Sequence, residues 1–148
     1  MRFFLGLILA ASFAFSAHSQ TLNPVKWSFS AEKNDDGTYN VLLTAAVQAG
    51  WYIYSQTLDE GGPIPTSFAF ETKGGVEFLG KTEENGTKKE GFDPVFEMNV
   101  IKYSNKVVFT QKVKASPATK ITGTLTYMTC DNERCLPPSD VDFSIVLP

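Results

Sequence analysis

The chain has 148 residues, of which 43% are hydrophobic and 20% are charged, and its formal net charge is −3. This length and composition indicate one globular domain and disfavour a disordered chain or a coiled coil. The charge is also not basic enough to suggest a nucleic-acid partner. Two cysteines and a single histidine narrow the possible chemistry further.

Residues 1–19 have the pattern of a secretory signal peptide. Arg2 is followed by an apolar run over residues 3–15, and small residues then precede a cleavage site before Gln20. The apolar run is too short for a membrane-spanning helix, which needs roughly 20 apolar residues, and no later segment comes near that length. We therefore predict a signal peptide over residues 1–19 and an exported domain over residues 20–148 without a membrane span of its own.

Cleavage at this position removes His18, the single histidine. A mature chain without imidazole excludes Ser-His-Asp and Cys-His hydrolases and every site in which histidine binds zinc or copper. Two sulfurs are also too few for a structural zinc site. We expect no metal and no organic cofactor, and the remaining candidate chemistry rests on Cys130, Cys135, carboxylates, lysines and tyrosines.

Short segments with period-two alternation run through the mature chain and predict strands. The first two, over residues 27–31 and from Tyr39 onward, flank Asp35-Asp36-Gly37, in which Asp-Gly favours a tight hairpin turn. Further strands are predicted over residues 51–55, 67–72, 76–79, 95–103, 107–114, 121–129 and 141–147, with turns at Gly61-Gly62-Pro63, Gly74-Gly75, Ser104-Asn105 and Ser116-Pro117. About 8 to 9 short strands without an amphipathic helix predict an all-β fold, an immunoglobulin-like antiparallel β-sandwich.

One polar segment, residues 81–91, interrupts this pattern with charges of both signs and two glycines. We expect it to be a long exposed loop that contains a turn at Asn85-Gly86. The same residues with Thr87 match an N-glycosylation sequon, which matters only in a host that glycosylates secreted proteins.

The two cysteines are separated by four residues in the connection between the last two predicted strands. A turn there brings the Cα atoms within the roughly 4.4 to 6.8 Å that a disulfide needs, and export favours its formation. A ring of about six residues stabilises a fold by only about 2 kcal/mol, and a short ring on an exposed turn leaves its sulfurs accessible to an attacking thiolate. The residues alone leave open a redox-active disulfide and a structural one.

The last predicted hairpin reads Tyr127-Met128-Thr129-Cys130 and, after four residues, Cys135-Leu136-Pro137-Pro138. On an exported β-sandwich, this hairpin resembles the N-terminal periplasmic domain of the thiol:disulfide interchange protein DsbD. The stretch Gly50-Trp51-Tyr52-Ile53-Tyr54-Ser55 resembles that family's Gly-aromatic-Tyr-aliphatic-Tyr strand, and the segment from Phe96 through Tyr103 to Val113 resembles its cap loop and the strands that follow. The resemblance extends from about Trp27 to Leu147, with one residue fewer between the cysteines than in the family members.

This resemblance implies an immunoglobulin-like domain whose cysteine pair carries reducing equivalents. Cys130 and Cys135 would be the exchanging pair, and Cys135 would form the mixed disulfide with a partner. Phe96 would be the cap phenylalanine that shields the disulfide, with Phe92 as the fallback, and Tyr52 and Tyr54 would flank the site. Ordinary core packing is the alternative for Phe96 and for both tyrosines.

The resemblance also implies a periplasmic location and a function as a thiol-disulfide exchange carrier, an activity of the protein-disulfide reductase type. A DsbD-like membrane electron donor or a thioredoxin-like domain would reduce the pair, which would then reduce thioredoxin-fold proteins such as disulfide isomerases and the thioredoxins of cytochrome c biogenesis. Because the sequence ends at Pro148 without transmembrane helices, the donor would be a separate membrane protein. The alternative is a non-catalytic secreted immunoglobulin-like binding module with a structural disulfide.

Overall fold

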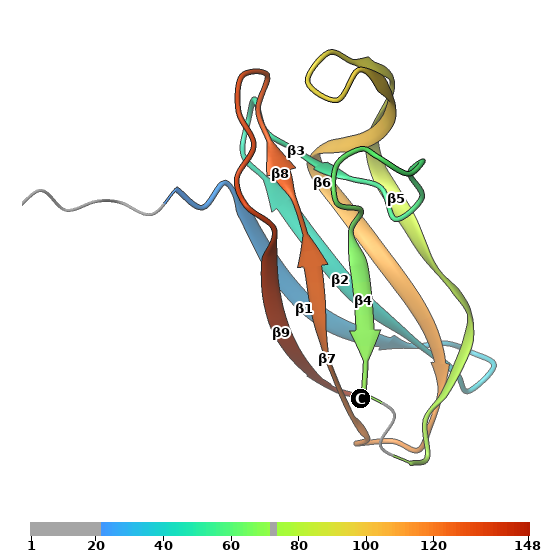
Figure 1. Ribbon diagram of the computed structural model, residues 1–148. Helices are drawn as coiled ribbons and strands as arrows, with labels where there is room; N and C mark the ends of the chain where they lie inside the picture. The colour runs from blue at the N-terminus through green and yellow to red at the C-terminus, as the bar shows by residue number, and fades with distance from the viewer. Residues whose placement is uncertain (1–21, 72–73) are drawn as a thin grey trace, which may run out of the picture.

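The computed structural model describes residues 22–71 and 74–148. In these ranges, two antiparallel sheets pack face to face as a β-sandwich (Figure 1), which confirms the predicted fold class. No helix within the described ranges is long and apolar enough to cross a membrane. The predicted signal peptide lies outside the described residues and stays a prediction.

The larger sheet has six strands, in the order β1-β2-β6-β3-β8, and β5 also pairs with β6. The long strand β6 pairs with β2 along one half and with β3 along the other, while β5 pairs with its opposite edge. The smaller sheet has the order β4-β7-β9. The strands are β1 (Val25–Lys33), β2 (Tyr39–Val47), β3 (Tyr52–Tyr54), β4 (Ser67–Phe70), β5 (Glu77–Asp93), β6 (Met98–Lys114), β7 (Lys120–Tyr127), β8 (Thr129–Cys130) and β9 (Ser139–Val146).

The main core lies between the two sheets and is built from alternate residues of their strands. Leu43 on β2 and Phe109 on β6 are fully buried from the larger sheet, and Ile121 and Leu125 on β7 face them from the smaller one. Successive side chains of a strand point to opposite faces, so the period-two pattern of the sequence buries one face of each sheet. This apolar burial holds the two sheets together.

The first hairpin agrees with its prediction. β1 and β2 pair over their full length, and Gly37 lies in the connecting turn with a φ of +79°, a conformation that glycine adopts without a steric penalty. The short Asp-Gly turn therefore sets the register of the edge of the larger sheet.

The prediction of an exposed loop over residues 81–91, with a turn at Asn85-Gly86, is wrong. The whole segment belongs to β5, and residues 83–91 pair with β6. Its side chains are mostly polar because much of this strand faces solvent, and sheet pairing uses only backbone groups. Gly86 lies at a register shift, where a Cβ atom would meet the carbonyl oxygen of Lys106 at 2.5 Å, so this glycine allows a close backbone approach and does not mark a turn.

The turn predicted at Ser104-Asn105 is also absent, since β6 continues through both residues. Asn105 has a φ of +60° and lies opposite the register shift of β5, which is the geometry of a β-bulge. The polar pair thus bends one long strand where the sequence pattern suggested two. The strand β6 begins at Met98, whereas the prediction began at Val95, which belongs to the preceding turn.

The strand predicted over residues 121–129 is divided between the two sheets. β7 ends at Tyr127 in the smaller sheet, whereas β8 pairs with β3 in the larger one, so the chain changes sheets at Met128. Thr129 is buried toward the core side of the larger sheet, and alternation turns Cys130 to its outer face. The crossing therefore places the first cysteine outside the main core.

Candidate redox site

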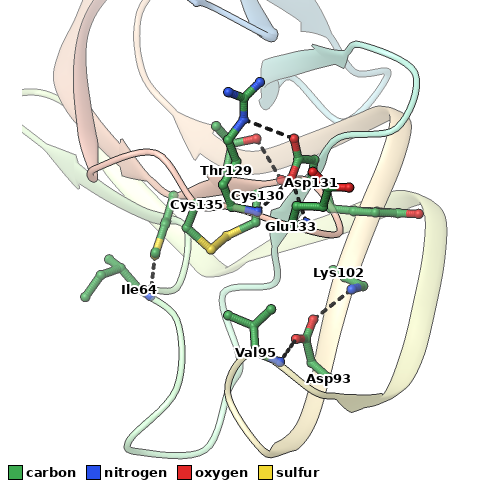
Figure 2. Close-up of a disulfide and its surroundings, with 12 residues drawn as sticks. Ile64, Asp93, Val95, Lys102, Thr129, Cys130, Asp131, Glu133 and Cys135 are labelled. Carbon is green, nitrogen blue, oxygen red and sulfur yellow. Dashed lines mark hydrogen bonds and ion pairs between the residues drawn. A yellow bond between two sulfur atoms is a disulfide. The ribbon is translucent and has the colours of Figure 1, made fainter.

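Cys130 and Cys135 form a disulfide at one end of the sandwich (Figure 2). Their Cα atoms are 4.0 Å apart, slightly closer than the range expected for disulfides, because the two residues face each other across an antiparallel bridge. Backbone hydrogen bonds join the neighbouring pairs on both sides, from Asp131 to Arg134 and from Leu136 to Thr129. The cysteines are therefore a non-hydrogen-bonded pair, the arrangement in which facing Cα atoms come closest.

The tip of this hairpin is closed by the side chain of Asp131. Its Oδ1 atom accepts hydrogen bonds of 2.8 Å from the backbone N–H groups of Glu133 and Arg134, and these bonds hold the pKa of Asp131 below its usual value. The Arg134 guanidinium contacts Oδ2 of the same carboxylate and lies 5.5 Å from the ring centroid of Trp51. An aspartate side chain that accepts hydrogen bonds from the backbone two and three residues ahead stabilises a turn. The hairpin is therefore stabilised by these local hydrogen bonds as well as by the disulfide.

The disulfide lies in a small apolar cluster, the disulfide cluster, which is separate from the main core. Strands β3, β6 and β8 contribute to it, together with the segment between β3 and β4 and the turn between β5 and β6 (Figure 1). Its buried members are Tyr54, Val100 and Cys130, and Leu58, Phe96, Met98, Met128 and Cys135 pack against them. Cys130 is only 2% exposed, whereas Cys135 is half-buried, so the two cysteines differ in exposure.

Phe96 is placed in this cluster by the turn that joins β5 to β6. Its ring meets that of Tyr54 edge to face, with the centroids 5.9 Å apart. Phe96 thus belongs to the disulfide cluster and not to the main core, and its role as the cap stays a prediction. Phe92, the fallback, is 67% exposed on β5 and is not a member of the cluster.

Tyr52 and Tyr54 lie on β3, on the face that carries the disulfide cluster. Tyr52 is the pairing partner of Cys130, and its carbonyl oxygen accepts a 2.8 Å hydrogen bond from the hydroxyl of Thr129. Tyr54 is buried, and burial together with the nearby charge of Asp93 raises the pKa of its phenol, which therefore stays neutral. The two tyrosines thus lie beside the disulfide, on the same face of β3.

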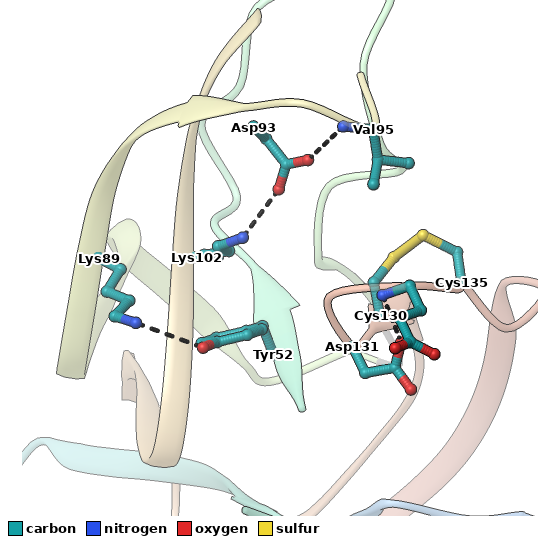
Figure 3. A network of polar contacts seen from close by, with 9 residues as sticks. Tyr52, Lys89, Asp93, Val95, Lys102, Cys130, Asp131 and Cys135 are labelled. Carbon is teal, nitrogen blue, oxygen red and sulfur yellow. Dashed lines mark hydrogen bonds and ion pairs between the residues drawn. A yellow bond between two sulfur atoms is a disulfide. The ribbon is translucent and has the colours of Figure 1, made fainter. Parts of the chain in front are cut away.

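Asp93 and Lys102 form an ion pair beside Tyr52 (Figure 3). The ammonium of Lys102 lies 4.6 Å from the ring centroid of Tyr52 and 2.8 Å from Oδ2 of Asp93, while Oδ1 of Asp93 accepts a 3.0 Å hydrogen bond from the N–H of Val95. The Asp93 residue is 4% exposed. Burial acts to raise the pKa of Asp93, but the Lys102 ammonium and the turn N–H groups outweigh it and hold that pKa below its usual value.

Asp93 and Lys102 are site-bordering residues that the sequence pattern does not mark. An aspartate directly before proline is a turn signal, and this is the one hint that the sequence offers. Lys102 lies on a strand in which polar and apolar residues alternate, where a lysine on the outer face is expected. The two residues meet because β5 and β6 pair in antiparallel register.

Exposed apolar side chains also gather at this end of the molecule. Val95 is 50% exposed on the turn, and Ile64 is 43% exposed on the segment between β3 and β4, where its N–H donates a 3.4 Å hydrogen bond to the sulfur of Met128. In the part of the chain that the structure describes, no group of three or more His, Cys, Asp or Glu residues is placed to hold a metal ion.

The family model of the N-terminal domain of the thiol:disulfide interchange protein DsbD matches residues 18–147. The chain belongs to this family. The resemblance inferred from the sequence is thereby confirmed, and membership in the DsbD N-terminal family supports thiol-disulfide exchange in general terms. Among curated proteins, none matches the chain in sequence.

Three solved structures share the fold. The Neisseria meningitidis DsbD N-terminal domain in its reduced form superposes with a TM-score of 0.54 at 18% identity, covering 72% of this chain and 76% of that one. The complex between the DsbD and PilB N-terminal domains of N. meningitidis gives 0.57 at 17% identity, with coverages of 83% and 85%. The N-terminal periplasmic domain of ScsB from Proteus mirabilis gives 0.53 at 22% identity, covering 83% of this chain and 44% of that one.

Proposed function

We propose that this protein is a periplasmic carrier of reducing equivalents that cycles the Cys130–Cys135 pair between disulfide and dithiol. The observation that carries the proposal is the place of the disulfide, in a small cluster outside the main core with Cys135 half-buried. A six-residue ring at the molecular edge contributes little to stability, whereas a partly exposed cysteine on a turn, here Cys135, is suited to exchange.

The exposure of the sulfurs supports an order of events. In the reductive half-reaction, a donor thiolate attacks Sγ of Cys135, a donor–Cys135 bond forms, and the bond to Cys130 breaks to release a thiolate that takes up a proton. A second donor thiolate then attacks the donor sulfur of the mixed disulfide and releases Cys135 as a thiolate, which takes up a second proton. Two electrons and two protons have entered the pair, and the donor leaves as a disulfide.

In the oxidative half-reaction, the Cys135 thiolate attacks the disulfide of an acceptor and forms a new mixed disulfide. Cys130, adjacent across the hairpin, then attacks Sγ of Cys135, which re-forms the internal disulfide and releases the acceptor as a dithiol. No metal or organic cofactor takes part. The roles of Cys130 and Cys135 follow from their burial, the first as resolving thiol and the second as the sulfur that joins the partner.

The surrounding residues have supporting roles in this proposal. Phe96, packed on Tyr54, shields the disulfide from unsuitable thiols until a partner displaces it. Tyr52 and Tyr54 line one side of the site. The exposed Val95 and Ile64 supply apolar contact for the partner. Such a rim of apolar groups around a buried reactive bond suits a folded protein partner better than a small thiol.

We assign the partners by family. The acceptors are thioredoxin-fold proteins of the periplasm, including those of cytochrome c biogenesis, and the donor is a DsbD-like membrane protein or a thioredoxin-like domain. A protein partner at this fold has support in the Neisseria complex between a DsbD N-terminal domain and a PilB N-terminal domain. The predicted signal peptide and the periplasmic ScsB domain support the location.

The reduction potential of the Cys130–Cys135 pair tests this function. The chain over residues 20–148 is equilibrated against a thiol redox buffer, quenched, and the oxidised and reduced forms are counted by mass spectrometry. We expect a potential between about −270 and −180 mV, where dithiol carriers operate. A potential well below about −300 mV is that of a structural disulfide and would leave a secreted binding module.

A further inference from the structure

The turn between β5 and β6 is held in a conformation that the backbone alone does not favour. Glu97, its last residue, has a φ of +55°, a left-handed conformation that costs a non-glycine residue free energy. Such a conformation persists where surrounding contacts hold it in place. The contacts of this turn therefore determine whether Phe96 stays on the disulfide cluster.

Asp93 makes the contacts that hold the turn. One oxygen of its carboxylate accepts the N–H of Val95 at 3.0 Å, and the other accepts the ammonium of Lys102 at 2.8 Å. Lys102 lies near the start of β6, nine positions along the chain, where it pairs with Tyr54 of β3, so the ion pair ties the turn to the larger sheet. The side chains of Lys102 and Asp93 are 20% and 5% exposed, which limits screening of the pair by water.

Lys102 also contacts Tyr52, which lies beside the disulfide. Its ammonium lies over the ring of Tyr52, 4.6 Å from the centroid, and Tyr52 is the pairing partner of Cys130. The turn and the cysteine strand are thus linked through Asp93, Lys102 and Tyr52 (Figure 3).

We propose that Asp93 and Lys102 form a latch that keeps the turn over residues 94–97, and with it Phe96, closed over the disulfide. The inference deepens the proposed exchange function and rests on it. The two residues are positioning residues, because they act on the reacting sulfurs only through the turn. A partner that binds the exposed side chain of Val95 would displace the backbone of the same residue and so break the hydrogen bond from the Val95 N–H to Asp93. Docking of the partner would thereby release the latch.

The rate of disulfide reduction by dithiothreitol tests the latch. The dithiothreitol thiolate attacks the disulfide and is itself oxidised to its cyclic disulfide, and the rate is measured at neutral pH on folded protein by acid quenching and mass spectrometry. We expect Lys102→Met and Asp93→Asn to be reduced about tenfold faster than the wild type, the effect of removing one charge-assisted contact. Lys102→Arg, which keeps the charge, should be reduced close to the wild-type rate.

A matched control is available on the same strand. Lys112 on β6 forms an ion pair of the same length, 2.8 Å, with Asp36 in the β1–β2 turn, away from the disulfide. Lys112→Met should be reduced at the wild-type rate, which separates a local effect on the turn from a general loss of stability. Should Asp93→Asn fail to fold, Lys102→Met carries the test alone.

The outcomes separate the latch from the function on which it rests. A Lys102→Met rate indistinguishable from those of the wild type and Lys112→Met overturns the latch, even where the potential lies in the carrier range. Faster reduction of Lys102→Met with a potential in the structural range supports the latch as a shield of a structural disulfide and overturns the carrier function.

Discussion

At the scale of single residues, the two cysteines are chemically equivalent in the sequence and unequal in the structure. Both were predictable as the disulfide pair because the chain holds no other cysteine. Their difference was not, since the burial of Cys130 depends on β3, β6 and the turn that carries Phe96, all distant along the chain. The same holds for Asp93 and Lys102, whose meeting depends on strand register.

This inequality predicts how single-cysteine variants react. Cys130→Ser leaves the half-buried Cys135, which should form a mixed disulfide with oxidised glutathione several times faster than the buried Cys130 does in Cys135→Ser. The adduct is followed by mass spectrometry over time, with the unfolded variants in denaturant as the control for intrinsic reactivity. Faster reaction of Cys135→Ser would reverse the proposed roles of the two sulfurs.

At the scale of elements, composition misled at β5 because a strand with one solvent-facing side needs few apolar residues. Glu84 on this strand shows that a polar side chain of β5 can anchor neighbouring segments by hydrogen bonds. Its carboxylate accepts the hydroxyl of Ser55, the N–H of Gln56 at 3.0 Å and the hydroxyl of Tyr103 at 3.1 Å. Burial and the Glu84 charge raise the pKa of Tyr103 to about 12. One carboxylate thus ties β5 to the end of β3 that carries the site tyrosines.

Removal of this carboxylate should weaken the fold. Glu84→Ala leaves the buried hydroxyl of Ser55 without its acceptor, and we expect a loss of about 1–3 kcal/mol in the free energy of unfolding. Urea unfolding followed by circular dichroism measures it. Glu83→Ala, one residue earlier on the exposed side of the same strand, is the control and should change stability by less than about 0.5 kcal/mol. Equal losses in both variants would contradict the anchoring role of Glu84.

At the scale of the whole molecule, the sandwich follows from alternation, because each strand must bury one face. The division of strands between the sheets did not follow from it. Residues 121–129 read as one strand, and only the pairing of Thr129 with Ile53 moves the last residues to the larger sheet. The family resemblance compares residue order, which alternation does not use, and through it Phe96, Tyr52 and Tyr54 were named as site residues; their roles stay predictions.

The separation of the disulfide cluster from the main core predicts that the fold survives without the bridge. The double variant Cys130→Ala with Cys135→Ala should keep the circular dichroism spectrum of the wild type and lose about 2 kcal/mol in the free energy of unfolding, the value for a six-residue ring. Chemical denaturation of both proteins under identical conditions gives the difference. A variant that no longer folds would mean that the bridge is a structural requirement.

The sheet change at Met128 has a consequence for how a partner meets this protein. The two ends of the cysteine hairpin, Tyr127 and Ser139, stay paired in the smaller sheet, while Cys130 lies at the edge of the larger one. We therefore expect that forming or breaking the sulfur bond leaves the contacts between the sheets unchanged. Under the proposed function, donor and acceptor would approach the same sandwich, and the two oxidation states would differ only in the few residues around the sulfurs.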